Sequence, residues 1–196
     1  MRVTLMMMEE YVSCVEIGAG MADQKEIFPP HFEGGNLMTT KAEFDIVTAL
    51  RSMEFFHDME PNHLHKLAAI AREVTFASGD LVYKEGDLDK GMYLVQEGEV
   101  VIEMKSLAQG YAPVLTIGKG QLFGWSSLFP GQRKRARARV LKDTRALLID
   151  TERLNYLFEI DHQLENVVMR RMIKLVGERV YATRQILVKC PEVSLG

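Results

Sequence analysis

The chain has 196 residues and a formal net charge of −3, from 24 basic and 27 acidic side chains. This length suits one domain with a hydrophobic core plus an extension, and the slightly acidic balance gives no global reason to expect nucleic-acid binding. The sequence has no apolar run near the roughly 18 residues that a membrane helix needs. Its two cysteines, Cys14 and Cys190, lie near opposite ends, which argues against a disulfide framework or a cysteine-rich metal site and fits a reducing, cytoplasmic compartment.

Residues 1–40 show no sustained periodicity and contain two breaks, Pro29-Pro30 and Gly34-Gly35. They lack the basic start, the apolar stretch and the cleavage site of a signal peptide. Two interpretations stay open: the segment is disordered, or it is upstream sequence translated from a misassigned start. In the second case Met38, and not Met1, is the true start. We assign no function to this segment.

Two short helices are expected next, over residues 41–73. In the first helix, Phe44, Val47 and Leu50 fall near one face. The second helix begins at Pro61, which suits a first helical position, and runs to about residue 73.

From residue 74 to residue 150 the hydrophobic period changes to two, as in β-strands. Short apolar runs alternate with turns that carry a glycine, at 78–80, 85–87 and 97–99. Many short strands at such spacing indicate a β-barrel or a jelly roll. The predicted fold class is therefore mainly β with flanking α: a jelly-roll-like β-roll, preceded by short helices and followed by a long C-terminal helix.

The C-terminal part, residues 151–190, is expected to be helical, with its long helix over 163–187. There, apolar residues such as Leu164, Val168 and Met172 recur at three- and four-residue spacing. This stripe serves either as an intramolecular lid or as a homodimer seam. Its heptad pattern is imperfect because it includes Arg179, so both alternatives stay open.

Residues 123–150 begin with features of a small-anion site. The backbone amides of residues 124–128 lie at the start of a helical turn, where geometry and dipole favour an anion. Ser126 and Ser127 add hydroxyl donors, and their simpler role is to cap the turn.

The strand that follows has two unlike faces. Lys134 shares its face with Ala136, Ala138 and Val140, which indicates that this face points inward. Lys134 is therefore the natural pocket cation; the alternative is a solvated loop lysine. The opposite face carries a row of arginines, namely Arg133, Arg135, Arg137 and Arg139. We interpret this row as a solvated strand edge and not as a nucleic-acid site, because it lacks interleaved aromatic residues.

The order of these elements resembles the cyclic nucleotide-binding domain, the effector module of catabolite-activator-type transcription factors, cyclic-nucleotide-dependent kinases and gated channels. The resemblance covers roughly residues 43–187 and includes Ser-Gly-Asp at 78–80, Lys-Glu-Gly-Asp at 84–87 and Glu-Gly-Glu-Val at 97–100. Transcription factors of this type carry a DNA-binding helix-turn-helix after the long helix. The present chain ends shortly after that helix, so direct promoter binding is not expected.

The family's phosphate-binding cassette typically reads Phe-Gly-Glu, then small residues and Leu, then a loop, and then Arg followed by Ala. This chain matches Phe and Gly at 123–124 and Leu at 128, and Lys134 falls on the arginine position. The resemblance implies a ligand-binding set that consists of Phe123, Gly124, Trp125, Ser126, Ser127, Leu128, Lys134, Arg135 and Ala136.

Trp125 stands where the family has a glutamate that accepts a hydrogen bond from the ribose 2′-hydroxyl. An indole can only donate, and a lysine does not grip a phosphate bidentately as an arginine does. Losing both features lowers the affinity by on the order of a hundredfold, so ordinary cyclic AMP binding is not expected. Trp125 either stacks on a different ligand or fills the pocket.

Other motifs are weak. His63 and His65 form a His-x-His pair, but their side chains diverge on a helix, so no metal site is expected. The sequence has no catalytic arrangement with persuasive spacing and no Walker-type loop, so neither an enzyme nor a bound cofactor is expected.

The sequence thus predicts a cytoplasmic regulatory module. Its small anionic ligand, a cyclic nucleotide or another phosphate-bearing molecule, would shift the terminal helix. The alternative is a ligand-free protein-interaction or scaffold domain whose pocket is filled by Trp125. A homodimer through residues 163–187 and a protein partner are compatible with both; nucleic-acid and membrane partners are not expected.

Overall fold

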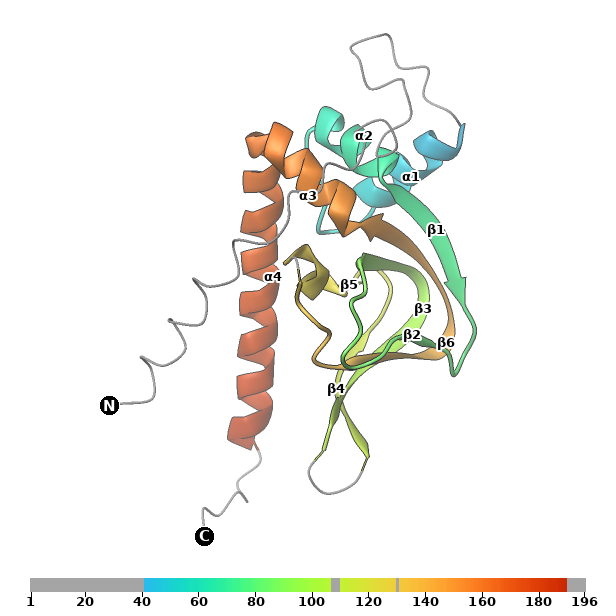
Figure 1. Cartoon of the computed structure of the whole chain (residues 1–196), viewed down its shortest axis with the longest axis vertical. Helices are drawn as coiled ribbons and strands as arrows, with labels where there is room; N and C mark the ends of the chain where they lie inside the picture. Colours follow the sequence, from blue (N-terminus) through green and yellow to red (C-terminus); the bar gives the residue numbers. More distant parts are fainter. Residues whose placement is uncertain (1–40, 107–109, 130, 190–196) are drawn as a thin grey trace, which may run out of the picture. The chain divides into compact units, whose positions relative to one another are not determined.

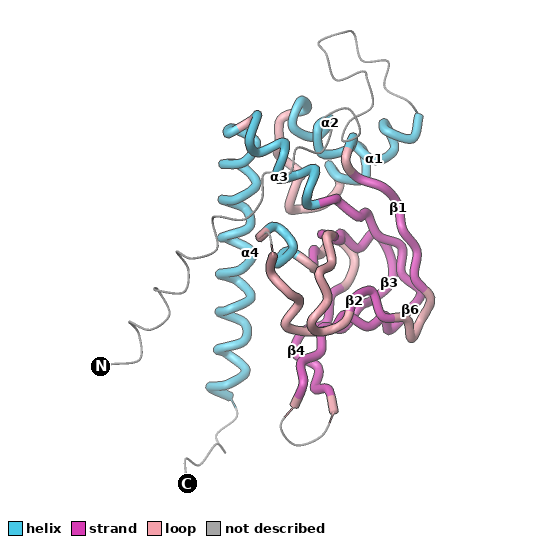
Figure 2. The backbone as a smooth tube through the Cα atoms, in the orientation of Figure 1, coloured by secondary structure: helices cyan, strands magenta, loops and turns pink. Residues whose placement is uncertain are grey.

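The computed structural model describes residues 41–106, 110–129 and 131–189, which lie within one compact unit, Thr39–Gly196. Figures 1 and 2 show helices around a curved antiparallel sheet. The two interpretations of residues 1–40, including a start at Met38, lie outside the described residues.

The N-terminal helices are α1 (Lys41–Arg51) and α2 (Pro61–Ala69). Pro61 opens α2 as expected, but the prediction that this helix reaches residue 73 is wrong. Strand β1 (Ala71–Phe76) begins there and pairs antiparallel with the end of β6, with Ala71 opposite Ile149. This ladder satisfies the backbone groups of residues 71–73, and that outweighs their helical pattern.

Six strands form one antiparallel sheet in the order β1-β6-β3-β4, with β2 beside β6 and β5 beside β3. The long strands β3 (Gly91–Lys105) and β6 (Arg137–Asp150) pair along most of their length and form its centre. The shorter strands are β2 (Leu81–Tyr83), β4 (Tyr111–Ile117) and β5 (Leu122–Phe123). The prediction of a mainly β fold with flanking helices is confirmed.

The core of the roll is aromatic and β-branched. It consists of Tyr83, Tyr93, Val95, Val100, Ile117, Phe123, Ala138 and Val140. Ala138 and Val140 thus occupy the inward face that the sequence predicted. Leu94, Leu147 and Ile149 point to the opposite face by the period of two and are also fully buried, so that this part of the sheet is covered on both sides.

The interpretation of the arginine row as a solvated edge is wrong for its last two members. Strand β6 lies between β3 and β2 at this point, with Arg139 opposite both Val101 and Leu81. The buried carboxylate of Glu103 accepts hydrogen bonds from Arg137 Nε at 2.8 Å and from Arg139 Nη2 at 2.7 Å. The sequence pattern placed these arginines on the outer face correctly, but it did not reveal the acid from β3 that pairs with them.

The C-terminal helices are α3 (Thr151–Ile160) and α4 (His162–Lys189). Asp150 caps α3, because its Oδ1 accepts hydrogen bonds from the backbone N–H groups of Glu152 and Arg153 at 3.0 and 3.1 Å. No helix among the residues that the structure describes is long and apolar enough to cross a membrane.

The apolar stripe of α4 is buried only near its start. Leu164, Val168 and Met172 are buried, whereas Val180, farther along the stripe, and its neighbour Tyr181 are 44% and 66% exposed. The first half of α4 therefore packs within the domain, and the second half leaves apolar side chains open to solvent.

Ion pairs fix the beginning of α4 to the N-terminal helices. Lys66 Nζ donates to Asp161 Oδ2 at 2.6 Å, at the junction of α3 and α4. Arg171 Nη2 donates to Asp58 Oδ1 at 2.6 Å, and its Nη1 donates to the carbonyl oxygen of Phe55 at 2.6 Å. The N-terminal helical region is thus joined to the beginning of α4.

The Glu103 cluster generates a stability prediction. The hydrogen bond from Arg139 holds the pKa of Glu103 below its ordinary value, although burial opposes this shift. The stabilisation is therefore complete above the unfolded-state pKa and is lost as the pH falls through the folded-state pKa. We expect Glu103→Gln to lower the free energy of unfolding by about 1–3 kcal/mol at neutral pH, and by progressively less in acid.

Urea denaturation at several pH values measures this difference. The matched control is Glu99→Gln, which removes an acid from a more exposed pair with Lys142 on the same two strands. We expect that control to cost less than about 1 kcal/mol. Equal losses in both variants would contradict the role given to the buried cluster.

Candidate functional site

Gly124 forms the tight turn of the cassette, called here the glycine hinge, between β5 and the short 3₁₀ helix η2 (Trp125–Leu128). Its φ of 78° lies in the left-handed region that favours glycine. A Cβ atom at this position would lie only 2.7 Å from the carbonyl oxygen of Gly91 and 3.0 Å from Tyr93 Cδ2. Both the backbone angle and the close packing therefore require a glycine here.

Lys134 is a buried cation beneath this turn, with 3% of its surface exposed. Its Nζ donates to Ser127 Oγ at 2.6 Å and to the carbonyl oxygen of Gly124 at 3.0 Å. The same atom lies 3.3 Å from Asp89 Oδ2 and 4.4 Å from the centroid of the Tyr83 ring. Burial lowers the pKa of Lys134, and Asp89 opposes that shift. The alternative of a solvated loop lysine is wrong.

Ser127 connects the cassette to the start of β3. Besides accepting the bond from Lys134, its hydroxyl donates to the carbonyl oxygen of Asp89 at 2.6 Å. Gly124 is the residue that caps η2, and no side chain caps it. The interpretation of the serines as helix caps is therefore wrong for this turn.

Trp125 lies half-buried at the first position of η2. Its ring meets the exposed ring of Phe129 edge to face, with the centroids 6.5 Å apart. The aromatic rings that fill the roll are those of Tyr83, Tyr93 and Phe123, and the last two stack with their centroids 5.0 Å apart.

Both terminal helices contact the cassette. Arg179 of α4 donates from Nη2 to the carbonyl oxygen of Leu122, just before the glycine hinge. Asn155 of α3 donates to the carbonyl oxygen of Leu128, the last residue of η2, at 3.2 Å. Burial lowers the pKa of Arg179, and Tyr83 opposes that shift. The sequence analysis missed Arg179 as a site residue; its one signal was a cation within an otherwise apolar stripe.

This geometry agrees with comparisons to known proteins. The family model for the cyclic nucleotide-binding domain matches residues 73–161, which contain the strands, the cassette and α3. Residues 73–161 form a cyclic nucleotide-binding domain. Over 110 residues the chain is 31% identical to a cyclic nucleotide-gated cation channel protein of Drosophila melanogaster, a match that covers 52% of this chain and 16% of that protein.

Other relatives are similar in the same region. The chain is 24% identical over 127 residues to the cyclic AMP receptor protein of Thermus thermophilus, covering 63% of this chain and 59% of that protein. A cyclic nucleotide-binding protein from Geobacter metallireducens shares the fold with a TM-score of 0.61 and 28% identity, over 68% of this chain and 96% of that one. The chain thus spans less than two thirds of the curated relatives that it matches here.

Within this cyclic nucleotide-binding domain, the predicted ligand set divides by location. Phe123, Gly124, Ser127, Leu128 and Lys134 are buried together around the turn, whereas Trp125, Ser126 and Ala136 are half-buried and Arg135 is exposed. Their role in ligand binding stays a prediction. His63 is buried on α2 with Nε2 3.7 Å from Asp161 Oδ2, and no group of three potential metal ligands occurs among the described residues.

The glycine hinge can be tested against a matched position. Gly120 has almost the same φ, 79°, but a Cβ atom there would meet nothing within 4 Å. We expect Gly120→Ala to cost about 1 kcal/mol of folding stability, from backbone strain alone. Gly124→Ala is expected to cost a further 1–3 kcal/mol, about the penalty of overpacking, since the neighbouring atom is backbone. Urea denaturation measures both, and equal costs would refute the steric role of position 124.

Proposed function

We propose that this cyclic nucleotide-binding domain is a regulatory sensor of a small phosphate-bearing ligand, which competes with Asp89 for the buried cation Lys134. The observation that carries the proposal is an excess of positive charge beside the cassette, from the buried Lys134 and the half-buried Arg179. Lys134 and Arg179 both lie close to Tyr83, and Asp89 is the carboxylate within 4.0 Å of Lys134. Within the described part of the chain, Arg179 has no carboxylate within that distance.

A phosphate would offset this imbalance. Arg179 is half-buried and has no carboxylate beside it, so it has lost part of its hydration without gaining an opposite charge. Phosphate oxygens accept charge-assisted hydrogen bonds from ammonium and guanidinium groups, which are about twice as strong as neutral ones. An anion between Lys134 and Arg179 would therefore be stabilised from the loop before β6 and from α4 at once.

The same contacts offer a route from ligand to helix. Arg179 holds the chain just before Gly124, and Asn155 holds it at the end of η2. A ligand that draws Arg179 away from the carbonyl oxygen of Leu122 changes how α4 rests on the roll. The ligand can shift the equilibrium between the two positions of α4 only by the difference between its affinities for them.

Trp125 bears on which ligand fits. The Thermus relative is named as a cyclic AMP receptor protein, but position 125 in this chain offers no acceptor for a ribose hydroxyl. We propose that cyclic AMP binds weakly and that the preferred ligand is phosphate-bearing but is not recognised through a ribose contact at this position.

A ligand-free interaction domain is the second candidate. It is favoured by the contacts of Lys134, which Ser127, Gly124 and Asp89 already provide from within the protein. It is also favoured by the exposed Ile173 and Tyr181 on α4, which would suit a protein partner or a second copy of the chain.

Calorimetric titration with cyclic AMP, cyclic GMP and cyclic dinucleotides separates the candidates. We expect saturable binding of at least one of these compounds, lost in Lys134→Met, a change that keeps the apolar stem. Lys142 is an exposed lysine of β6; Lys142→Met is the control and should bind as the wild type does. If Lys134→Met unfolds, Lys134→Arg tests the same cation and should keep binding. If none of these compounds binds, the sensor proposal is overturned and the interaction domain is favoured.

The weak binding of cyclic AMP can be tested by restoring the acid. We expect Trp125→Glu to raise the affinity for cyclic AMP by roughly tenfold or more, since one hydrogen bond to a charged group contributes about 1.5–3 kcal/mol. Trp125→Leu removes the indole without adding an acceptor and serves as the control. Equal affinities of the two variants in calorimetry would contradict the reason given for weak binding.

A further inference from the structure

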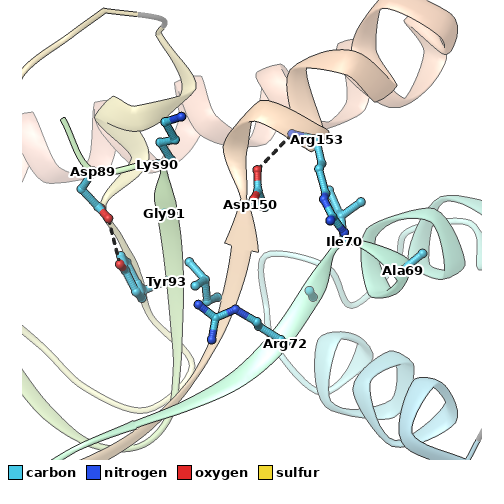
Figure 3. Close-up of a pocket in the computed structure, with 11 residues that line it drawn as sticks. Ala69, Ile70, Arg72, Asp89, Lys90, Gly91, Tyr93, Asp150 and Arg153 are labelled. Carbon is cyan, nitrogen blue, oxygen red and sulfur yellow. Dashed lines mark hydrogen bonds between the residues drawn. The ribbon is translucent and has the colours of Figure 1, made fainter. Parts of the chain in front are cut away.

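A second pocket, separate from the cassette, opens where α2, β1, β3, β6 and α3 meet (Figure 3). Its volume is about 410 Å³, within the range typical of small-molecule sites. None of the predicted cassette residues lines it. Two residues that do, Arg72 and Arg153, come from β1 and α3, which are far apart in the sequence. Figure 3 shows Arg153 extending from α3 toward the start of β1, and Arg72 extending from β1 toward β3.

The acidic groups of this pocket are already engaged. Asp150 Oδ1 accepts the two backbone bonds that cap α3. Asp89 accepts a hydrogen bond from the Tyr93 hydroxyl at 3.0 Å and faces Lys134 at 3.3 Å. The pocket's third cation, Lys90, pairs with Glu152 at 2.6 Å outside the cavity lining.

The two arginines therefore have no ion-pair partner of their own among the described residues, although Asp89 and Asp150 also line the pocket. Across residues 41–106, 110–129 and 131–189, neither Arg72 nor Arg153 has a carboxylate within 4.0 Å of its guanidinium group. The lining beside Arg72 is apolar, since Leu148 is its cross-strand partner on β6 and Tyr93 is the partner of Leu148 on β3. An apolar wall with a few convergent polar groups is the usual composition of a small-molecule site.

We propose that this pocket binds a small organic phosphate. Arg72 and Arg153 would hold the phosphate oxygens, because a guanidinium fork matches the geometry of two such oxygens. The apolar or aromatic body of the ligand would lie against Leu148 and Tyr93. The site does not depend on the proposed function of the cassette, although Asp89 borders both.

Phenyl phosphate is a suitable probe, because it combines a phosphate dianion with an aromatic ring. We expect the full chain to bind it saturably in calorimetry, and to bind inorganic phosphate, which lacks the ring, at least several-fold more weakly. Both Arg72→Gln and Arg153→Gln should weaken phenyl phosphate binding by roughly tenfold, the loss of one charge-assisted contact. Arg72 is exposed and Arg153 half-buried, and circular dichroism will show whether each variant stays folded.

Two comparisons make the result specific. Arg145→Gln removes an exposed arginine of β6 outside the pocket, whose nearest acid is 3.7 Å away, and should bind as the wild type does. Arg72→Gln leaves the contacts of Lys134 in place and should bind the cyclic nucleotides of the cassette test as the wild type does, so failure of the cassette proposal and failure of this one are distinguishable. No saturable binding up to about 10 mM would overturn the proposal. So would an equal loss in Arg145→Gln, which would indicate non-specific attraction, or a loss in Lys134→Met alone, which would place the probe in the cassette.

Discussion

A buried ammonium group organises the cassette. Lys134 has left water, so its polar contacts have to come from the protein, and they come from three separate segments. Asp89 precedes β3, Gly124 is the hinge after β5, and Ser127 lies in η2. Since one charge needs all three, the hinge, the short helix and the start of β3 are held in one arrangement. Under the proposed function, a ligand that offers this charge a better partner would loosen all three segments together.

The contacts of α4 would carry the proposed effect of a ligand from the cassette to the terminal helix. The start of α4 is fixed to α2 through Lys66 and Asp161, while Arg179, farther along the same helix, touches the cassette. Under the proposed function, a ligand that displaces Arg179 would let α4 change its tilt while its start stays fixed. Asp89 adds a second connection, because its carboxylate borders both the cassette and the pocket between β1 and α3.

The sequence pattern predicted correctly those features that depend on neighbouring residues in the chain. The period of two placed Lys134, Ala138 and Val140 on the inward face, and the structure confirms that all three are buried. The expected start of the strand was wrong, because β6 begins at Arg137 and Lys134 lies in the loop before it. The predictions that were wrong depend on partners distant in sequence. Residues 71–73 became a strand because β6 pairs with them, and Arg139 is not at a free edge because Glu103 approaches from β3. Likewise, Ser127 bonds to Asp89, which lies 38 positions away, instead of capping its own helix. Hydrophobic periodicity does not reveal contacts between residues that are distant in the sequence. Arg179 could therefore be noticed only as a cation that interrupts the apolar stripe of α4.

The position of the indole has a practical consequence. Trp125 is the only tryptophan of the chain, and it sits half-buried at the first residue of η2, beside Phe129. Ultraviolet emission excited in the indole therefore originates from one known place in the fold. A half-buried ring is sensitive to the water around it, so its emission maximum moves when the short helix becomes more or less hydrated. The unlabelled protein thus carries its own optical reporter in the segment where a rearrangement would begin.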